Sequence, residues 1–481
     1  MKPIFRGVVA VLALLAAGCT VGPKYQRPVI QSPVAYKETA PDAYKEWQAA
    51  HPSDATLRGD WWTLFGDAQL NALEQQVDVS NQNLKSAEAR FEQARALIKV
   101  QQSQRSPTVT VGPSITTNRD SATYAEATAK TSSQFGNFSL PFDVSYEVDA
   151  WGRVKHSIEA ARNEAQATEA DLETLRLSYH AELAYDYFEL RSADAEQKLL
   201  DDTVVAYQKA LDLTENRFEG GVAAGAEVAQ AKTQLEATKT QDADIAVRRA
   251  QFEHAVAVLT GQSPAALSLA PLPLTEEPPA IPVGLPSQLL ERRPDIAASE
   301  RRVAEANEQV GIAHAAFFPQ IMLGALLGLE GQSIGDWLNW PSRFWAVGPS
   351  VLQTVFDGGR RRATQQASEF DYDATVATYR ETALDAFQQV EDNLAALRVL
   401  EKETTTQKAA VAAAEQSLAL STNRYTGGLV TYLEVVTAQS AALANERTAV
   451  DILRRRMDAS VLLIKALGGG WDSSKLPKLT N

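Results

Sequence analysis

The chain carries an internal repeat, and this repeat limits what it can fold into. The segment Asn216–Val222 (Asn-Arg-Phe-Glu-Gly-Gly-Val) returns 207 residues later as Asn423–Leu429 (Asn-Arg-Tyr-Thr-Gly-Gly-Leu). The same offset relates Gly152-Arg153 to Gly359-Arg360 and Gly261 to Gly468, and an offset of 212 relates Pro107 to Pro319. We therefore expect two internal structural repeats that build one extended body.

Each copy contains a long stretch that predicts a long helix. No proline occurs between Trp151 and Arg217 or between Gly358 and Arg424, so each helix can run about 67 residues and about 100 Å. Apolar residues recur there at spacings of three and four, which is typical of a helix-packing seam. In the second copy they are Tyr372, Val376, Tyr379, Ala383, Phe387, Val390, Leu394 and Leu397.

Two shorter helices are expected in each copy, about 69–105 with 223–262 and about 286–316 with 430–467. Each pair sums to a length similar to that of the long helix. The short helices can therefore stack end to end beside it, so that the body becomes a helical cylinder wall.

Between the helices, the segments about 108–147 and 320–355 alternate between apolar and polar residues, which predicts strands of about ten residues. This is the length of a tilted bilayer-crossing strand. The alternation also fits a soluble sandwich with one buried face. Two hairpins make a poor sandwich, however, and aromatic residues cluster near the strand ends as an interfacial girdle would. They are Phe135, Phe138, Phe317, Phe318, Trp337, Trp340, Phe344 and Trp345.

On these grounds we favour membrane strands. No stretch reaches the roughly 18 apolar residues of a spanning helix, so a chain that crosses the membrane would do so as β-strands. Four strands cannot close a transmembrane barrel, since the smallest has about eight. The chain is therefore expected to share its barrel between protomers.

The N-terminus resembles a bacterial secretion signal. Lys2 and Arg6 precede an apolar run, and the chain's single cysteine, Cys19, follows Leu15-Ala16-Ala17-Gly18. This pattern resembles a lipobox, which implies acylation of Cys19; an accidental cysteine after an ordinary signal is the alternative. By analogy with lipoprotein sorting, Thr20 after the cysteine implies the outer membrane.

Composition and motifs exclude several other functions. The formal net charge of −14 argues against nucleic acid as a partner. The histidines His51, His156, His180, His254 and His314 lack ligand spacing, so we expect neither a metal nor another cofactor beyond the lipid on Cys19. Gly331–Gly335 matches the G-x-S-x-G nucleophile pattern, which needs a strand before it and a helix after it, but we expect it in the loop of the second hairpin. We therefore expect no enzymatic activity.

These patterns divide the chain into consecutive segments. They are a signal peptide (1–18), a lipidated extended segment (19–68), the first repeat (69–263), a proline-rich linker (264–285), the second repeat (286–470) and a C-terminal tail (471–481).

Several ordered motifs resemble the outer-membrane channels of tripartite efflux pumps, the TolC and OprM type, and especially its lipoprotein branch. The resemblance covers nearly the whole mature chain. Its pieces are Cys19–Pro28, Trp61-Trp62 with Phe65, Leu285–Ile296, Phe318-Pro319, Phe356–Arg360 and Lys465–Trp471.

The resemblance implies an α+β membrane protein. Four strands from each protomer of a homotrimer would form a twelve-stranded β-barrel, continuous with a long α-helical periplasmic barrel. An inner-membrane transporter of the resistance-nodulation-division (RND) type and a periplasmic membrane-fusion adaptor would deliver drugs or other small toxic solutes, and this protein would pass them out. Type I protein secretion and a non-conducting periplasmic lipoprotein scaffold are the alternatives.

The resemblance also implies two sites. The adaptor would dock at the turns that end the long helices, although their glycines also serve simply to terminate those helices. The docking residues are Arg217, Gly220, Gly221, Val222, Arg424, Gly427, Gly428 and Leu429. The periplasmic gate would use Leu433, and Thr437 occupies the position where some members have an acid. Glu434, whose repeat mate is Glu227, could supply an acidic ring, or could lie on a solvated helix face.

Overall fold

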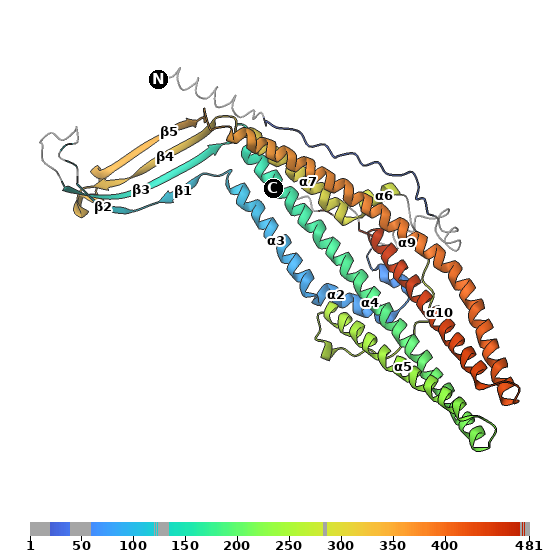
Figure 1. The fold of residues 1–481 in the computed structure, drawn as a ribbon. Coiled ribbons are helices and arrows are strands. Elements are labelled where there is room, and N and C mark those ends of the chain that lie inside the picture. Colours follow the sequence, from blue (N-terminus) through green and yellow to red (C-terminus); the bar gives the residue numbers. More distant parts are fainter. Residues whose placement is uncertain are drawn as a thin grey trace.

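The computed structural model describes residues 20–38, 59–119, 121, 123, 134–281, 286–471, 474 and 476. The expected signal peptide and Cys19 lie outside these residues. The described chain is elongated, with a sheet at one end and a helical body at the other (Figure 1).

The helical body contains the two long helices expected from the sequence. Helices α4 (Arg153–Glu219) and α9 (Arg360–Thr426) have 67 residues each. Their return helices, α5 (Gly225–Leu259) and α10 (Tyr432–Ala466), have 35 residues each. The apolar seam predicted for α9 is buried from Tyr379 onward.

The other short helices are each broken once, which differs from the two continuous helices that we expected. The first copy has α2 (Ala68–Ser80) and α3 (Gln82–Ser103), and the second has α6 (Pro286–Arg292) and α7 (Pro294–Ala315). Asn81 is extended and caps α3 by accepting from the amides of Asn83 and Leu84. Arg293 is also extended, because the proline that follows it disfavours helical backbone.

At both breaks, two short helices meet end to end. Asn81 Nδ2 donates to the carbonyl of Leu259, the last residue of α5, at 3.0 Å. Arg293 Nη1 donates to the carbonyl of Ala466, the last residue of α10, at 3.2 Å. These residues correspond through the 212- and 207-residue offsets. The two copies therefore form equivalent joints.

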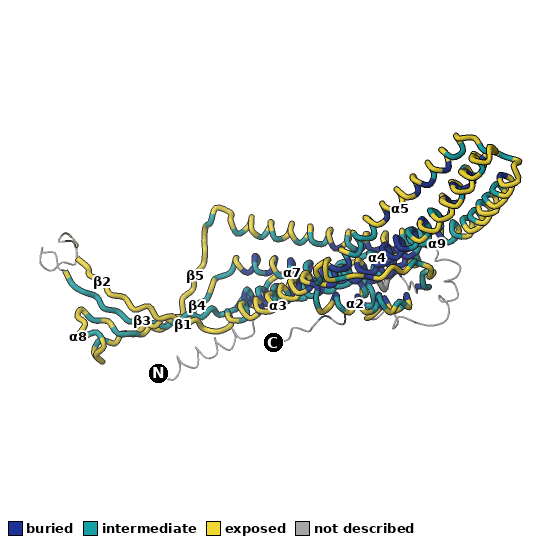
Figure 2. The backbone as a smooth tube through the Cα atoms, turned by 90° about the horizontal axis from the view of Figure 1, so that it is seen from below, coloured by how far each residue is buried: buried dark blue, intermediate teal, exposed yellow. Residues whose placement is uncertain are grey.

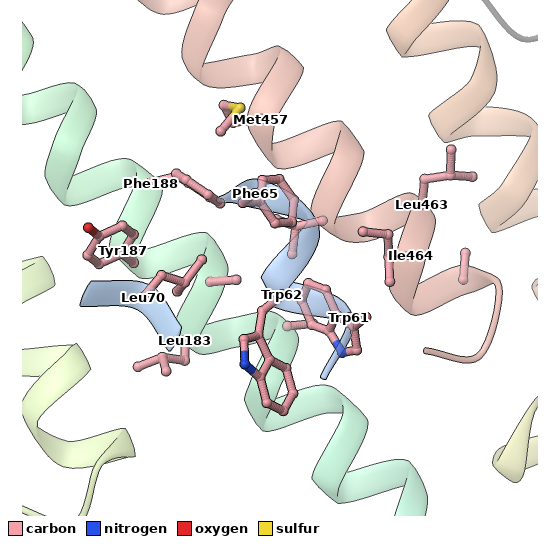
Figure 3. Close-up of a cluster of buried hydrophobic side chains, with 14 of the residues drawn as sticks. Trp61, Trp62, Phe65, Leu70, Leu183, Tyr187, Phe188, Met457, Leu463 and Ile464 are labelled. Atoms are coloured by element: carbon pink, nitrogen blue, oxygen red, sulfur yellow. The ribbon is translucent and has the colours of Figure 1, made fainter. Parts of the chain in front are cut away.

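The helices lie side by side in a fixed order. Near the sheet the order is α3, α4, α7 and α9, and at the far end it is α5, α4, α10 and α9 (Figure 1). The short helix η3 (Trp61–Phe65) packs its aromatic rings against α4 and α10 in the central core (Figure 3). Each long helix therefore contacts partners along both halves of its length.

The strands form one antiparallel sheet. Strands β1 (Thr108–Val111) and β2 (Ser114–Arg119) pair successively with β3 (Gln134–Val148), so the first expected strand is interrupted at Gly112-Pro113. Strand β3 pairs with β4 (Gln320–Gly331), and β4 with β5 (Arg343–Leu352). The sheet order is therefore β1/β2, β3, β4, β5, and the pairing of β3 with β4 joins the two repeats.

One face of this sheet is apolar and uncovered. The register aligns Phe142, Leu327 and Trp345 across three strands, and Val144, Ala325 and Val347 beside them. Directly paired residues point to the same face. Trp345 and Val347 are 73% and 71% exposed in the single chain, and the sheet extends away from the helical body (Figure 2). Such a face requires an apolar environment from outside the chain.

The long helices are not candidates for crossing a bilayer. In the described part of the chain, none of the helices combines the length and the apolar character that a transmembrane helix needs.

The segment 20–38 runs along the outside of α4, α7 and α9. The amide of Val21 donates to the carbonyl of Trp151 at 3.2 Å, at the end of the sheet. His156 Nε2 bonds the carbonyl of Val21 at 2.9 Å, while Nδ1 bonds Glu308 at 2.5 Å. Both ring nitrogens face acceptors, so the imidazole donates twice when it is protonated. The hydrogen bond to Glu308 raises the pKa of His156, which favours that charged form.

The proline-rich linker is fixed by buried charges. Arg191 Nη1 donates to the carbonyl of Ala270 at 2.8 Å and to Asp194, whose carboxylate accepts from the amide of Leu272. Arg249 also bonds Asp194 and donates to the carbonyl of Leu269 at 2.6 Å. These bonds therefore hold residues 269–272 of the linker against α4 and α5.

The joints predict an unequal response to two similar glycine substitutions. Gly261 and Gly66 share the same left-handed φ of 71°, but a Cβ on Gly261 would collide with the carbonyl of Ser80, whereas a Cβ on Gly66 meets open space. Gly66→Ala should cost about 1–2 kcal/mol of backbone strain. Gly261→Ala should cost about 1–3 kcal/mol more, because the joint must open. Thermal unfolding followed by circular dichroism measures both, and equal melting temperatures would contradict the joint.

Candidate functional site

The turn after α4 is closed by backbone hydrogen bonds. The amide of Val222 donates to the carbonyl of Arg217 at 2.8 Å, and that of Gly221 to Phe218 at 2.9 Å. These are the two bonds of a Schellman motif, which requires a left-handed residue. Gly221 supplies it with φ of 71°.

The turn after α9 repeats this geometry. The amide of Leu429 donates to the carbonyl of Arg424 at 2.9 Å, that of Gly428 to Tyr425 at 2.9 Å, and Gly428 has the same φ of 71°. The two tips lie together at the end of the body opposite the sheet (Figure 1). The docking residues predicted from the sequence therefore gather at one end of the molecule.

Arg217 joins the two tips. Its Nη1 donates to the carbonyl of Thr426 at 3.1 Å, and its guanidinium lies 4.8 Å from the centre of the Tyr425 ring. The Tyr425 hydroxyl in turn donates to Glu227 at 3.2 Å, in the first turn of α5. One arginine and one tyrosine thus connect α4, α9 and α5.

The repeat mates of these residues make different contacts. Arg424, the mate of Arg217, pairs with Glu434 at 3.2 Å within its own turn. Phe218, the mate of Tyr425, has no hydroxyl and is half exposed. The connection between the tips is therefore asymmetric, although the turns themselves are equivalent.

Tyrosines form the apolar support behind the tips. Tyr425 and Tyr432 contact each other edge to face, with ring centres 5.3 Å apart, and both are buried. Burial raises the pKa of Tyr425 and raises that of Tyr432 to about 12. Both phenols therefore stay neutral and keep their protons for donation. The cluster is completed by Tyr207, Leu211, Ala231, Leu235 and Val435.

The residues predicted for the gate begin α10. Leu433 and Thr437 are both exposed, and the Thr437 hydroxyl donates to the Leu433 carbonyl at 2.9 Å. Glu434 holds the ion pair with Arg424, and its mate Glu227 accepts from Tyr425. Each candidate acid thus already contacts a neighbouring tip residue.

The sequence analysis missed the contact of Arg217 with the Tyr425 ring and the hydrogen bond from the Tyr425 hydroxyl to Glu227. The available signal was the difference between the copies, because Phe218 becomes Tyr425 and only the second copy gains a hydroxyl donor.

The G-x-S-x-G sequence and the buried histidine His180 make hydrogen bonds that fit a structural role. Ser333 of the G-x-S-x-G sequence accepts from the amide of Asp336 and donates to its carboxylate at 2.7 Å, as the N-cap of the short helix α8 (Ile334–Trp337).

His180 is buried against Glu74 and Asp78. Burial opposes its charge, but the hydrogen bonds to these carboxylates outweigh that effect and raise the pKa of His180 to about 9. Within the described residues, no three His, Cys, Asp or Glu side chains group as a metal site.

Comparison with known proteins identifies the architecture. The chain matches the family described as outer membrane efflux protein over residues 73–262 and 285–469, one match in each repeat. It is 30% identical to the outer membrane protein OprJ of Pseudomonas aeruginosa, with 98% of each chain covered. It is 31% identical to TtgC of Pseudomonas putida, described as a probable efflux pump outer membrane protein, over 96% of this chain and 95% of the relative.

A solved structure has the same fold. The outer-membrane channel OprN superposes with a TM-score of 0.86 at 30% identity, covering 94% of this chain and all of that chain. Both repeats, the sheet and the paired tips fall within these matches, so the chain belongs to the outer membrane efflux protein family.

Proposed function

We propose that this protein is the outer-membrane exit duct of a tripartite efflux system. An RND-type inner-membrane transporter and a periplasmic adaptor would deliver drugs or other small toxic solutes to it. The observation that carries the proposal is the family match across both repeats. The duct is passive, and its partners supply the energy.

The open edges of the chain support a ring of several copies. Strands β1/β2 and β5 border the sheet, and α3 and α9 border the helical layer on the corresponding sides. Contacts between unlike edges generate a closed ring when the rotation closes. We propose three copies that form a twelve-stranded β-barrel in the outer membrane, continuous with a helical barrel in the periplasm.

The tips and the N-terminal segment support an orientation. The tips lie at the end opposite the sheet, where an adaptor would dock and where Leu433, Glu434 and Thr437 would form the gate. Thr20 packs against Gly152 at the sheet end of α4, and a Cβ on that glycine would lie 2.7 Å from Thr20. Cys19 directly precedes Thr20. We therefore propose that an acyl chain on Cys19 enters the membrane beside the sheet.

The exposed apolar sheet face argues for the channel over a periplasmic lipoprotein scaffold. In a soluble scaffold, Trp345 and Val347 would remain in contact with water. Type I protein secretion would use the same duct. We favour small-solute efflux because the family and the relative TtgC are described as efflux proteins.

The mass of the detergent-extracted particle tests the assembly. Native mass spectrometry should find three chains, each processed to Cys19 and carrying an acyl-sized increment on it. A monomer that is stable without detergent would overturn the channel. A trimer without the increment would remove only the lipid anchor.

The sheet faces predict unequal effects of one substitution at neighbouring positions. Val347 pairs with Ala325 on the apolar face, whereas Ala346 pairs with Leu326 on the opposite face. Val347→Arg should weaken membrane assembly, because an arginine at the bilayer midplane costs about 2–4 kcal/mol. Ala346→Arg is the matched control and should assemble. The yield of folded protein in outer-membrane fractions is the measurement, and the reverse order would show that the faces are exchanged.

The turns predict a loss of adaptor coupling. Gly221→Val and Gly428→Val should distort both turns. A left-handed backbone costs a residue with a Cβ about 1–2 kcal/mol, so each valine favours a different conformation. A loss of that size in the free energy of adaptor docking lowers the affinity for the adaptor roughly tenfold. Drug susceptibility of a strain that depends on this protein measures it. Gly66→Val, with the same φ far from the tips, is the control. Full resistance with both tip glycines changed would remove the docking site.

A further inference from the structure

A cavity of about 290 Å³ lies where the linker between the repeats meets α9 and α10. Its lining comes from residues 275–277 of the linker, 404–408 of α9 and 449–456 of α10. We infer that this cavity is a binding site for a small organic carboxylate with a compact apolar body. Such a site goes beyond the efflux duct, because it depends neither on the ring of copies nor on the solute that passes through it.

The cavity contains an arginine whose charge is incompletely matched. The Arg456 side chain is only 12% exposed, and its one ion pair within the described residues is with Glu277 at 3.5 Å. Its guanidinium donates no hydrogen bond to any residue that the structure describes. A guanidinium has five N–H donors in a planar fork that matches a carboxylate. Arg456 can therefore hold a further acceptor from inside the cavity.

The first copy shows how the same position is satisfied elsewhere in the chain. Arg249 is the repeat mate of Arg456 at the 207-residue offset. It bonds the buried carboxylate of Asp194 at 2.7 Å and the carbonyl of Leu269 in the linker at 2.6 Å. The mate of Asp194 is Glu401, which forms no ion pair with Arg456 in the described chain. The second copy therefore keeps the arginine without the buried carboxylate that matches it in the first.

Glu277 meets this need only from the edge of the cavity. Its carboxylate lies 3.2 Å from Lys408 Nζ and 3.5 Å from Arg456 Nη2, and its side chain is 58% exposed. The hydrogen bond from Lys408 lowers the pKa of Glu277, so the carboxylate stays ionised. Exposed ion pairs contribute little to stability. A second carboxylate can therefore replace Glu277 at small cost.

The rest of the lining defines the class of ligand. Helix α10 contributes an apolar wall made of Ala449, Val450, Ile452 and Leu453. Ligand pockets have volumes of about 300–1,000 Å³, so this cavity has room for a small molecule only. The two cations, Lys408 and Arg456, match one carboxylate. An aromatic or branched carboxylate fits both the charge and the size, whereas a long acyl chain or a polyanion does not.

Titration with 4-fluorobenzoate tests the site. The full-length protein in a non-ionic detergent is titrated and followed by fluorine NMR of the ligand. Neutral 4-fluorobenzamide is the matched ligand control, because it has the same ring without the charge. The benzoate should bind roughly tenfold more tightly than the benzamide, since only the benzoate makes a charged hydrogen bond with Arg456.

Four variants distinguish a ligand site from a structural ion pair. Arg456→Gln should weaken benzoate binding roughly tenfold. Glu277→Gln should instead strengthen it, because the competing carboxylate is removed while both cations remain. Val450→Phe keeps the charges and fills the cavity, so it should weaken binding even if Arg456→Gln does not fold. Lys402→Gln, which removes an exposed cation of α9 outside the cavity, is the control and should bind as the unmodified protein does.

Three outcomes would overturn the site. Equal binding of benzoate and benzamide would indicate uptake by the detergent. Unchanged affinity in Arg456→Gln and Val450→Phe would place the ligand elsewhere. Binding in Glu277→Gln alone, or in none of the proteins, would show that Glu277 is a permanent partner of the two cations and that the unmodified protein takes no ligand there. Each of these results leaves the efflux function intact.

Discussion

The end-to-end joints of the short helices are the constraint on which the structure depends. Each long helix of 67 residues needs a partner along its whole length, and a 35-residue return helix covers only half of it. Asn81 and Arg293 join a second short helix to each return helix, because their side chains donate to the last carbonyls of α5 and α10. Gly261 and Gly468 permit the contact because neither position has room for a side chain. The helical wall follows from this geometry.

The two tips have the same backbone geometry but make different side-chain contacts. The turns at Gly221 and Gly428 have the same φ and the same hydrogen bonds. The side chains differ, since Arg217 reaches across to Tyr425 while Arg424 stays on Glu434. A duplicated fold thus supplies two similar tips, and one bonded pair decides how they are held together.

Buried charged side chains hold together segments whose contact no helix or strand pattern in the sequence indicates. Arg191, Asp194 and Arg249 fix the linker between the repeats, and His156 fixes the N-terminal segment beside the sheet. Removing one member of a buried pair leaves a charge without a partner, which typically costs about 3–5 kcal/mol. These groups therefore hold the linker and the N-terminal segment at fixed places on the helical body. Their partners are distant in the chain, so the sequence alone does not identify them.

The sequence by itself determined the repeats, the long helices, the alternating strands and the glycine turns, because each depends on local spacing and on the absence of proline. It missed the breaks at Asn81, Arg293 and Gly112-Pro113, where capping or a following proline overrides a longer pattern. Only the tertiary structure decided the pairing of β3 with β4, the bond from Arg217 to the second tip, and the two open edges. These depend on which distant segments meet, and that is set by packing of the whole chain rather than by any local pattern.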